Sequence, residues 1–478
     1  MIKMKFLKTK GFKIFLTVWI IYIFFLSHYS GSWMADSVIH SSMAFVDNGN
    51  FITDDYIKES CKLPENGCDE SFYNGHFYSG FGPGGSILAM PLAFIFKVVL
   101  NPILYKITGI ELSIQFKTII LNILNTIFVS SLLSALLSVI LYKFLGYFIK
   151  EEKSKLLITF LFAFGTIFFI YSVEYSLRVM AGFFLFLSFY LLFKCKREGI
   201  NNKYLFFSGL SGAFAVSLEY TSGIIFIILS VYLLTFLRNR KIIIYGLGAL
   251  IPILLMLSYH YFVFGDPFQT AYGLRANPLN QDAMSNKFLR LDNINIENIW
   301  VYFFSPERGL FFFMPFLIFS LFGIYYGLKK RELYKECMLI LLVLIAHIIL
   351  LLFMGWNWNM DGAFGPRYLT TIIPFLVLPS ALAIKRFFKS FLVFGAISVF
   401  INTLGVLYGI TGLWTGASGV KNPIFNFYIP TMLKRGITND TLNLIKFKIY
   451  DLPIYLINIV AIIGLIIISG IIYLIWKK

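Results

Sequence analysis

The chain has 478 residues, of which 58% are hydrophobic and 19% aromatic, whereas only 14% are charged. An ordinary soluble domain does not carry that much apolar surface, but a bundle of lipid-facing helices does. The net charge of +17 would point to nucleic acid if the basic residues formed one patch. They are instead divided among short clusters that separate apolar runs, which excludes a nucleic-acid partner.

Apolar runs of roughly 17–25 residues, each long enough to cross a bilayer, recur along the whole chain. The first follows a cluster of lysines and lacks a small-x-small cleavage site, so we predict a signal anchor, with a cleaved signal peptide as the alternative. The pattern predicts an all-α polytopic membrane protein with about twelve transmembrane helices. Their predicted positions are 13–30, 118–145, 156–173, 179–193, 204–218, 221–237, 242–263, 309–328, 337–354, 369–384, 390–411 and 454–475.

The segment 86–105 is also long enough to span, but Ser86, Lys97 and Asn101 fall on one helical face and two prolines interrupt it. If it crossed the membrane, the short basic loops that follow would lie outside, against the positive-inside rule. We therefore predict a juxtamembrane amphipathic helix within a first outer loop, 31–117.

With this topology the chain is a multi-pass protein of the cell membrane, with both termini in the cytoplasm. The cytoplasmic loops are short and basic, whereas the outer side carries three long segments, 31–117, 264–308 and 412–453, where function is expected. We divide the chain into a transmembrane core, 1–385, and C-terminal helices with an outer loop, 386–478.

The four cysteines fit this topology. Cys61 and Cys68 lie in the first outer loop, where oxidation to a disulfide is expected, while Cys195 and Cys337 lie at cytoplasmic helix ends and are expected to stay reduced. The sequence contains no zinc-ligand spacing and no nucleophile elbow. It also contains no Walker loop, so an ATP-driven pump is not expected. No cofactor is required by the pattern, and a divalent metal remains an open alternative.

Charged residues at the outer surface are the main functional signal, because charge beside hydrocarbon is costly. Asp36 follows the first apolar run, where partial desolvation suits a general base, and a helix cap or solvated loop acid is the alternative. Glu174 and Arg178 occupy a tight outer connection and either form a helical ion pair or border a site. Glu219 repeats this signal more weakly in the next outer turn.

The stretch GHFYSGFGPGGSILAMP at 75–91 turns through several glycines into the predicted amphipathic helix. Free N–H groups at such a helix start suit an anion, and a flexible turn is the alternative. His76 and Tyr78, in the same stretch, are candidate substrate-binding residues.

A second motif, GWNWNMDGAFGPRYL at 355–369, precedes a late apolar run. Arg367 either clamps a phosphate at headgroup depth or snorkels toward lipid phosphates. Trp356, Trp358 and Asp361 are candidate substrate-binding residues, although an aromatic belt also explains the tryptophans.

These residues together resemble C-type, polyprenyl-phosphate-dependent glycosyltransferases. The similarity rests on Asp36 after the first span, FYSGFGPGGSILAMP, FGDPFQTAYG at 264–273, SPERGLFFFMP at 305–315 and WNWNMDGAFGPRY. The similar groups are the protein O-mannosyltransferases and the lipid A aminoarabinose transferases. The resemblance covers about 13–385, and the order of the motifs carries it.

This resemblance implies a helical bundle with juxtamembrane helices over a lipid-accessible cavity. It also implies a sugar donor on a polyprenyl phosphate and a protein, lipid or glycan acceptor. Asp36 would be the general base and Glu174 a second acid that orients the acceptor or a metal. Arg367, with Arg308 or Arg178, would neutralise the leaving phosphate.

The sequence departs from the family pattern at two places. Many relatives have a basic residue before the Pro-rich turn, where this chain has Ser79 and Phe81, and relatives with an acidic pair after the first span have Glu where Ser37 stands. Both departures bear on the roles assigned to single residues.

The main alternative is a lipid or small-solute transporter or flippase without transferase activity. It would place charged groups facing one another in mid-membrane, yet His260 and His347 are the ionisable exceptions within four central apolar runs. A lone histidine in an apolar helix is typically a hydrogen-bonded packing residue. A structural or assembly protein would not need so many charged residues at one interface, so the pattern favours a transferase.

Overall fold

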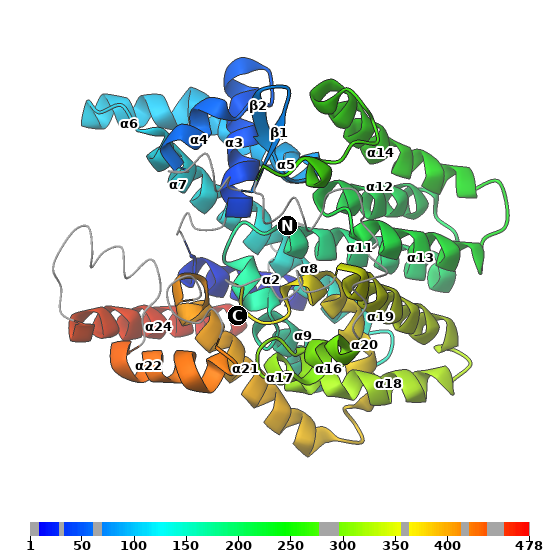
Figure 1. The fold of residues 1–478 in the computed structure, drawn as a ribbon. Coiled ribbons are helices and arrows are strands. Elements are labelled where there is room, and N and C mark those ends of the chain that lie inside the picture. Colours follow the sequence, from blue (N-terminus) through cyan, green and yellow to red (C-terminus); the bar gives the residue numbers. More distant parts are fainter. Residues whose placement is uncertain are drawn as a thin grey trace, which may run out of the picture.

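A computed structural model describes residues 9–27, 33–60, 69–276, 296–354, 363–412, 420–436 and 454–477. Helices make up most of this part of the chain, together with one antiparallel two-stranded hairpin, and the protein is a polytopic α-helical membrane protein (Figure 1). Predicted residues Cys61, Cys68, Trp356, Trp358 and Asp361 lie outside the described residues.

The first third of the chain forms one long helix, a polar outer segment and a second long helical run. Its elements are α2 (Lys10–Phe24), α3 (Trp33–Asn48), α4 (Asp54–Ser60), β1 (Glu70–Tyr73), β2 (His76–Ser79), α5 (Pro83–Ile95), η2 (Phe96–Leu100), α6 (Asn101–Thr108), α7 (Ile114–Asn125), η3 (Thr126–Ser131) and α8 (Leu132–Leu145). The strands pair from Glu70 opposite Ser79 to Tyr73 opposite His76.

The middle of the chain is a series of helices with short connections, α9 (Glu152–Phe164), α10 (Phe168–Ser172), α11 (Leu177–Glu198), α12 (Asn202–Leu218), α13 (Ser222–Leu234), α14 (Ile242–Phe264) and η4 (Ala271–Leu274). The last part contains α16 (Glu297–Phe304), α17 (Leu310–Phe313), η6 (Pro315–Ile318), α18 (Phe319–Leu328), α19 (Tyr334–Met354), η8 (Arg367–Ile372), α20 (Ile373–Ala383), α21 (Phe388–Gly412), η10 (Ile424–Tyr428), α22 (Ile429–Arg435) and α24 (Ile454–Lys477).

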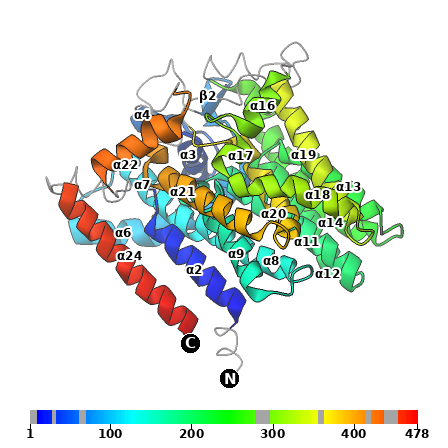
Figure 2. The same cartoon turned by 90° about the horizontal axis from the view of Figure 1, so that it is seen from below.

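The basic loops gather at one end of the bundle, which we call the basic end. Contacts join them in sequence, Lys10 with Glu152, Tyr147 with Glu198, Arg197 with the carbonyl of Glu332, and Lys335 with that of Thr235. The last turn of α24 joins this group, because the Lys13 ammonium lies 5.9 Å from the Trp476 ring centre. The start of α2 and the end of α24 therefore lie on the same side (Figure 2).

The opposite end, which we call the site end, is where α2 ends and α11 begins. There the Ser27 N–H donates to the Val173 carbonyl over 2.9 Å. In Figure 2 the hairpin, α4 and α16 lie on this side, away from the start of α2. The polar outer segments of the sequence therefore share one end of the molecule.

The helices α2 and α8 are antiparallel neighbours. Trp19 donates to the Ile127 carbonyl (3.0 Å), whereas Gly11, nearer the start of α2, packs against Val139. The intervening chain thus leaves α2 and enters α7 at the site end, with no net crossing of the bundle. This is what a juxtamembrane helix at 86–105 requires, because a segment that crossed the membrane there would bring the chain into α7 at the opposite end.

Seven described helices are long and apolar enough to cross a membrane, and all but one coincide with predicted spans. The exception is Pro83–Thr108, 26 residues long, which contains the predicted juxtamembrane segment. The predicted count of about twelve remains a prediction, because other expected spans are shorter or broken helices.

Two of these breaks have local causes in glycine and proline. The run predicted at 156–173 is interrupted at Gly165, where a Cβ would lie 2.8 Å from the Leu161 carbonyl oxygen. The run predicted at 309–328 breaks at Met314, whose ψ of 64° is not helical. Pro315 follows, and a proline disfavours the α conformation of the residue before it.

Candidate active site

Asp36 lies in the first turn of α3, at the site end, and faces α7. Asn122 of α7 donates through its Nδ2 to Asp36 Oδ1 over 2.8 Å. Burial raises the pKa of Asp36 to about 6, although His40 and the hydrogen bond from Asn122 oppose the rise. A carboxylate with this pKa is ionised near neutral pH and still basic enough to accept a proton.

His40 and Glu70 complete what we call the Asp36 cluster, made up of Asp36, His40, Glu70 and Asn122. His40 lies one helical turn after Asp36, and its Nδ1 is 3.9 Å from Glu70 Oε1, with both side chains 2% exposed. Burial raises the pKa of Glu70, against hydrogen bonds from His40 and Ser37. The negative charge of Glu70 in turn favours the protonated form of Asp36.

The two positions at which the sequence departs from the family pattern contact each other. Ser37 Oγ lies 3.0 Å from Ser79 Oγ at the end of β2. Phe81, in the other departing region, is covered by the Arg275 guanidinium, whose Cζ is 4.3 Å from the ring centre. A basic side chain from a distant segment, Arg275, thus lies beside Phe81 in the first loop.

The glycine-rich turn before α5 is tightly packed, unlike the flexible turn considered from sequence. A Cβ on Gly82 would lie 2.2 Å from the Ser217 carbonyl oxygen, and one on Gly85 would meet Leu177 and Val38. The helix start therefore contacts protein closely. Gly85 marks the place where α3, α5 and the start of α11 meet, so this turn joins Asp36 to the segment that carries Arg178.

Three arginines predicted from separate motifs come together with Glu174, and we call Arg178, Arg308, Arg367 and Glu174 the arginine cluster. Burial raises the pKa of Glu174 to about 7, while Arg178 and Arg367 oppose this rise. Burial also lowers the pKa of Arg308, and the neighbouring Arg367 lowers it further. Positive charge thus exceeds negative charge within the cluster, which favours an anion.

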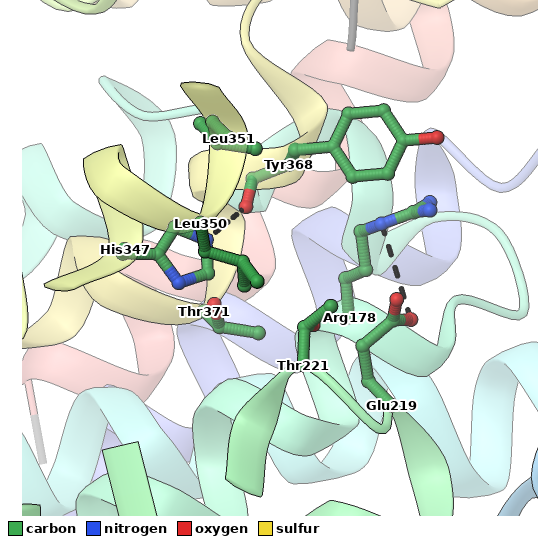
Figure 3. A pocket seen from close by; sticks show the side chains of 8 residues that line it. All are labelled: Arg178, Glu219, Thr221, His347, Leu350, Leu351, Tyr368 and Thr371. Atoms are coloured by element: carbon green, nitrogen blue, oxygen red, sulfur yellow. Dashed lines mark hydrogen bonds and ion pairs between the residues drawn. The ribbon is translucent and has the colours of Figure 1, made fainter. Parts of the chain in front are cut away.

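The ion-pair partner of Arg178 is Glu219 rather than Glu174, the partner considered from sequence. Arg178 Nε lies 4.0 Å from Glu219 Oε2. On its other side Arg178 stacks over Tyr368, with Cζ 4.5 Å from the ring centre (Figure 3). The Arg367 Cζ lies 5.2 Å from the centre of the same ring. Tyr368 therefore holds two of the arginines by cation–π contacts.

A continuous series of contacts joins the surroundings of the Asp36 cluster to the arginine cluster. Asp69, next to Glu70, binds Arg275 over 2.9 Å, and Arg275 lies over Tyr272. The Tyr272 hydroxyl donates to Glu219 over 3.2 Å, and Glu219 faces Arg178. The motif at 264–273 therefore bridges the first outer loop and the start of α11.

The two other described candidates, His76 and Tyr78, have structural contacts in the hairpin. His76 Nδ1 lies 2.7 Å from Asp54 Oδ2 and the histidine is exposed. Tyr78 is buried against Phe264, with ring centres 5.8 Å apart. These contacts do not join either side chain to the Asp36 cluster, so their substrate-binding roles remain predictions.

Sequence reasoning missed Asn122, Glu70 and Arg275. Each meets its partner from a segment remote along the chain, and residue type alone did not mark it. The position of His40 beside Asp36 could have been predicted, because residues four apart lie on the same face of a helix.

Within the described ranges, no three His, Cys, Asp or Glu side chains converge to hold a metal ion. Cys195 and Cys337 are buried free thiols, as predicted.

No protein-family profile and no curated protein matches the chain. The solved structures that are similar to it include two oligosaccharyltransferases. One is the oligosaccharyltransferase AglB from Archaeoglobus fulgidus in complex with an inhibitory peptide and a dolichol-phosphate, with 14% identity, 93% of this chain covered and a TM-score of 0.43. The other is an Archaeoglobus fulgidus oligosaccharyltransferase with Zn and sulfate, with 14% identity, 92% covered and a TM-score of 0.45. The chain spans 60% and 57% of their lengths.

Proposed function

We propose that this protein is a membrane glycosyltransferase that moves a sugar from a polyprenyl-phosphate donor to an acceptor hydroxyl at the outer face of the membrane. The observation that carries the proposal is the pairing of two unlike sites at one end of an apolar bundle. One is a partly desolvated carboxylate, Asp36, with its pKa raised to about 6. The other is a cluster of three arginines, of which Arg308 is buried and Arg178 and Arg367 are partly buried.

The arginine cluster binds the phosphate of the donor. Arg308 is 6% exposed and the Arg178 side chain 12%, so their charges are poorly hydrated and gain from a bound anion. Negative charge builds up on the phosphate as its bond to the sugar breaks, and fixed positive charges stabilise that change. The prenyl chain of the donor remains in the surrounding lipid.

Asp36 accepts the proton of the acceptor. The acceptor oxygen forms a bond to the anomeric carbon of the sugar as the bond from that carbon to the phosphate oxygen breaks. The polyprenyl phosphate leaves with the bonding electrons, and the acceptor proton moves to the Asp36 carboxylate. Asn122, through its hydrogen bond to Oδ1, holds the carboxylate in place for this step.

Glu174 orients the acceptor. Glu174 is partly buried near Arg178 and Arg367, and desolvation raises the pKa of its carboxyl to about 7. At neutral pH it is therefore partly protonated and both donates and accepts hydrogen bonds. The acceptor, whether protein, lipid or glycan, needs only a hydroxyl group for the chemistry described.

The test is transfer of a radiolabelled sugar in membranes that contain the purified protein. A panel of polyprenyl-phosphate sugars is supplied, and products are separated from unreacted donor. We expect at least one labelled sugar to appear in a new glycosidic linkage together with free polyprenyl phosphate. Movement of the intact lipid between leaflets without a new linkage would instead identify a transporter.

A further inference from the structure

A small pocket lies beside the arginine cluster, between the starts of α11 and α13 and the segments α19 and η8. Arg178, Glu219, His347, Thr371, Tyr368 and Leu350 line it. Figure 3 shows Arg178 and Glu219 on one side and His347 and Thr371 on the other. Glu219, His347 and Thr371 are each no more than 3% exposed.

The polar atoms of this pocket have unused hydrogen-bonding capacity. His347 Nδ1 and Thr371 Oγ1 are buried and have no hydrogen-bond partner among the described residues. Arg178 Nε and Glu219 Oε2 face each other as an ion pair, but at 4.0 Å they are too far apart for a hydrogen bond. A buried polar group without a hydrogen bond is costly, and this pocket is lined by two such groups and by an ion pair that makes no hydrogen bond between these two atoms. A polar ligand would satisfy all four atoms.

The His347 tautomer defines what that ligand must offer. His347 Nε2 lies 2.7 Å from the Tyr368 carbonyl oxygen, which only accepts, so Nε2 carries the proton. In the neutral ring Nδ1 is then an acceptor. The pocket therefore presents two acceptors, His347 Nδ1 and Glu219 Oε2, and two donors, Arg178 Nε–H and the Thr371 hydroxyl.

This mixture of donors and acceptors suits hydroxyl groups. A hydroxyl both donates and accepts, whereas a phosphate dianion only accepts and would face the Glu219 carboxylate. The pocket also adjoins the Tyr368 ring that is flanked by Arg178 and Arg367. We propose that this pocket binds hydroxyl groups of the donor's sugar, next to the arginines that bind its phosphate, an inference that rests on the proposed function.

Thr371→Val is the decisive variant, because valine has nearly the same shape and lacks the hydroxyl. The protein is placed in lipid nanodiscs, and dissociation constants are measured for farnesyl phosphate and for farnesyl phosphate carrying glucose, galactose or mannose. We expect at least one sugar to strengthen binding over farnesyl phosphate alone. Thr371→Val should reduce that gain about 3- to 10-fold, the worth of one hydrogen bond, and leave the affinity for farnesyl phosphate unchanged.

The melting temperature of Thr371→Val provides a second measurement. Since the Thr371 hydroxyl has no hydrogen-bond partner among the residues that the structure describes, its removal should leave the melting temperature without ligand equal or higher. The matched control is Thr159→Val at the basic end, which loses a bond to the Lys155 carbonyl (2.8 Å). The control should lower the melting temperature and leave the sugar-dependent gain intact.

Glu219→Gln provides a third measurement with inorganic phosphate as the probe. If the pocket binds hydroxyls, this variant should weaken the sugar-dependent gain and strengthen phosphate binding, because a negative charge is removed beside Arg178. Weaker phosphate binding in Thr371→Val with no sugar effect would make the pocket an anion site and overturn the inference.

The outcomes separate this inference from the proposed function. Sugar transfer by the native protein without any sugar-dependent gain in affinity overturns the pocket assignment and leaves the transferase. A gain that is lost in Thr371→Val in a protein without transfer activity supports the pocket and overturns the transferase. If no sugar strengthens binding and no transfer occurs, both fail.

Discussion

At the scale of single residues, Asp36 combines burial with a hydrogen bond that fixes one carboxylate oxygen. The Asn122 amide occupies Oδ1, so Oδ2 remains for the acceptor proton. Desolvation has the larger effect on the pKa, since it outweighs the opposing charge of His40 and the bond from Asn122. The side chain is therefore more basic than an exposed aspartate, which is what proton abstraction needs.

Asp36→Asn should lower the transfer rate by about 10²- to 10⁴-fold, the usual contribution of a general base. Asparagine keeps the size and can still accept the bond from Asn122, but it cannot take up the proton. Donor affinity should stay near normal, because the proposed phosphate site is the arginine cluster and does not include Asp36. The measurement is initial transfer rate at saturating donor, with donor binding recorded on the same preparation.

Asp54→Asn and Asp55→Asn are the internal controls for this prediction. Asp54 binds His76 and the Phe77 N–H in the exposed hairpin region, so its loss should have a mild effect. Turnover close to native in Asp36→Asn would falsify its assignment as the base. A dead Asp54 or Asp55 variant would instead move the base further along the first outer loop.

The raised pKa of Asp36 also predicts a pH dependence. The base must be ionised, so kcat/KM should rise as pH increases through about 6 and level off above it. Acidification protonates Asp36 and removes activity. The pH at which activity falls should therefore lie well above 3.8, the ordinary pKa of an aspartate. Full activity at pH 4.5 would contradict this assignment, as would the same acidic limb in the residual activity of Asp36→Asn.

Arg367→Ala should weaken donor binding about 10- to 100-fold, because a charged hydrogen bond contributes about 1.5–3 kcal/mol. Acceptor binding should change much less. Arg386→Ala is the matched control, since Arg386 stacks over Tyr326 at 5.5 Å, much as Arg367 stacks over Tyr368 at 5.2 Å. Equal loss of donor and acceptor affinity would indicate a folding defect.

At the scale of elements, α5 positions the site through close backbone contacts. Its first turn approaches the end of α12, where Gly82 meets the Ser217 carbonyl, and it approaches α3 and α11 at Gly85. Glycine is required at position 82 because there is no space for a side chain. Its backbone angle is ordinary, with a φ of −62°. Any side chain there would separate α5 from α12.

Gly82→Ala should therefore destabilise the fold by about 1–3 kcal/mol, the usual cost of overpacking. The neighbour it would strike is backbone, which cannot rotate away. Gly246→Ala in α14 is the control, because its Cβ would meet nothing within 4 Å. Alanine favours a helix there, so this variant should match or exceed the native melting temperature. Equal melting temperatures for both variants would contradict the close approach.

Much of the helical framework could be predicted from the apolar runs, which give the long helices their positions. The breaks at Gly165 and Met314 escaped prediction, because hydropathy does not register a local change in backbone angle. Asp36 and the arginines could be identified, since charge beside an apolar run is rare. Asn122 and Glu70 could not, because only folding brings them to Asp36.

At the scale of the whole molecule, the two ends of the bundle are chemically unlike. The basic end joins short loops by ion pairs such as Lys10 with Glu152. The site end brings together the Asp36 cluster, the arginine cluster and the segment 264–276 through the contacts of Arg275. Each side chain of the proposed site is thus carried by a segment that starts or ends at the same surface.

This polarity leads to the topology prediction. A reporter fused after residue 152 should face the cytoplasm, because Glu152 pairs with Lys10 at the basic end and positive loops stay inside. One fused after residue 110 should face outward, since α7 starts at the site end and α2 and α8 are antiparallel. Alkaline phosphatase and green fluorescent protein fusions at both positions give opposite readouts for the two sides. If both positions report the same side, the run from α7 to α8 does not cross the membrane. If position 110 alone is cytoplasmic, the proposed site faces the wrong compartment for an outer-leaflet donor.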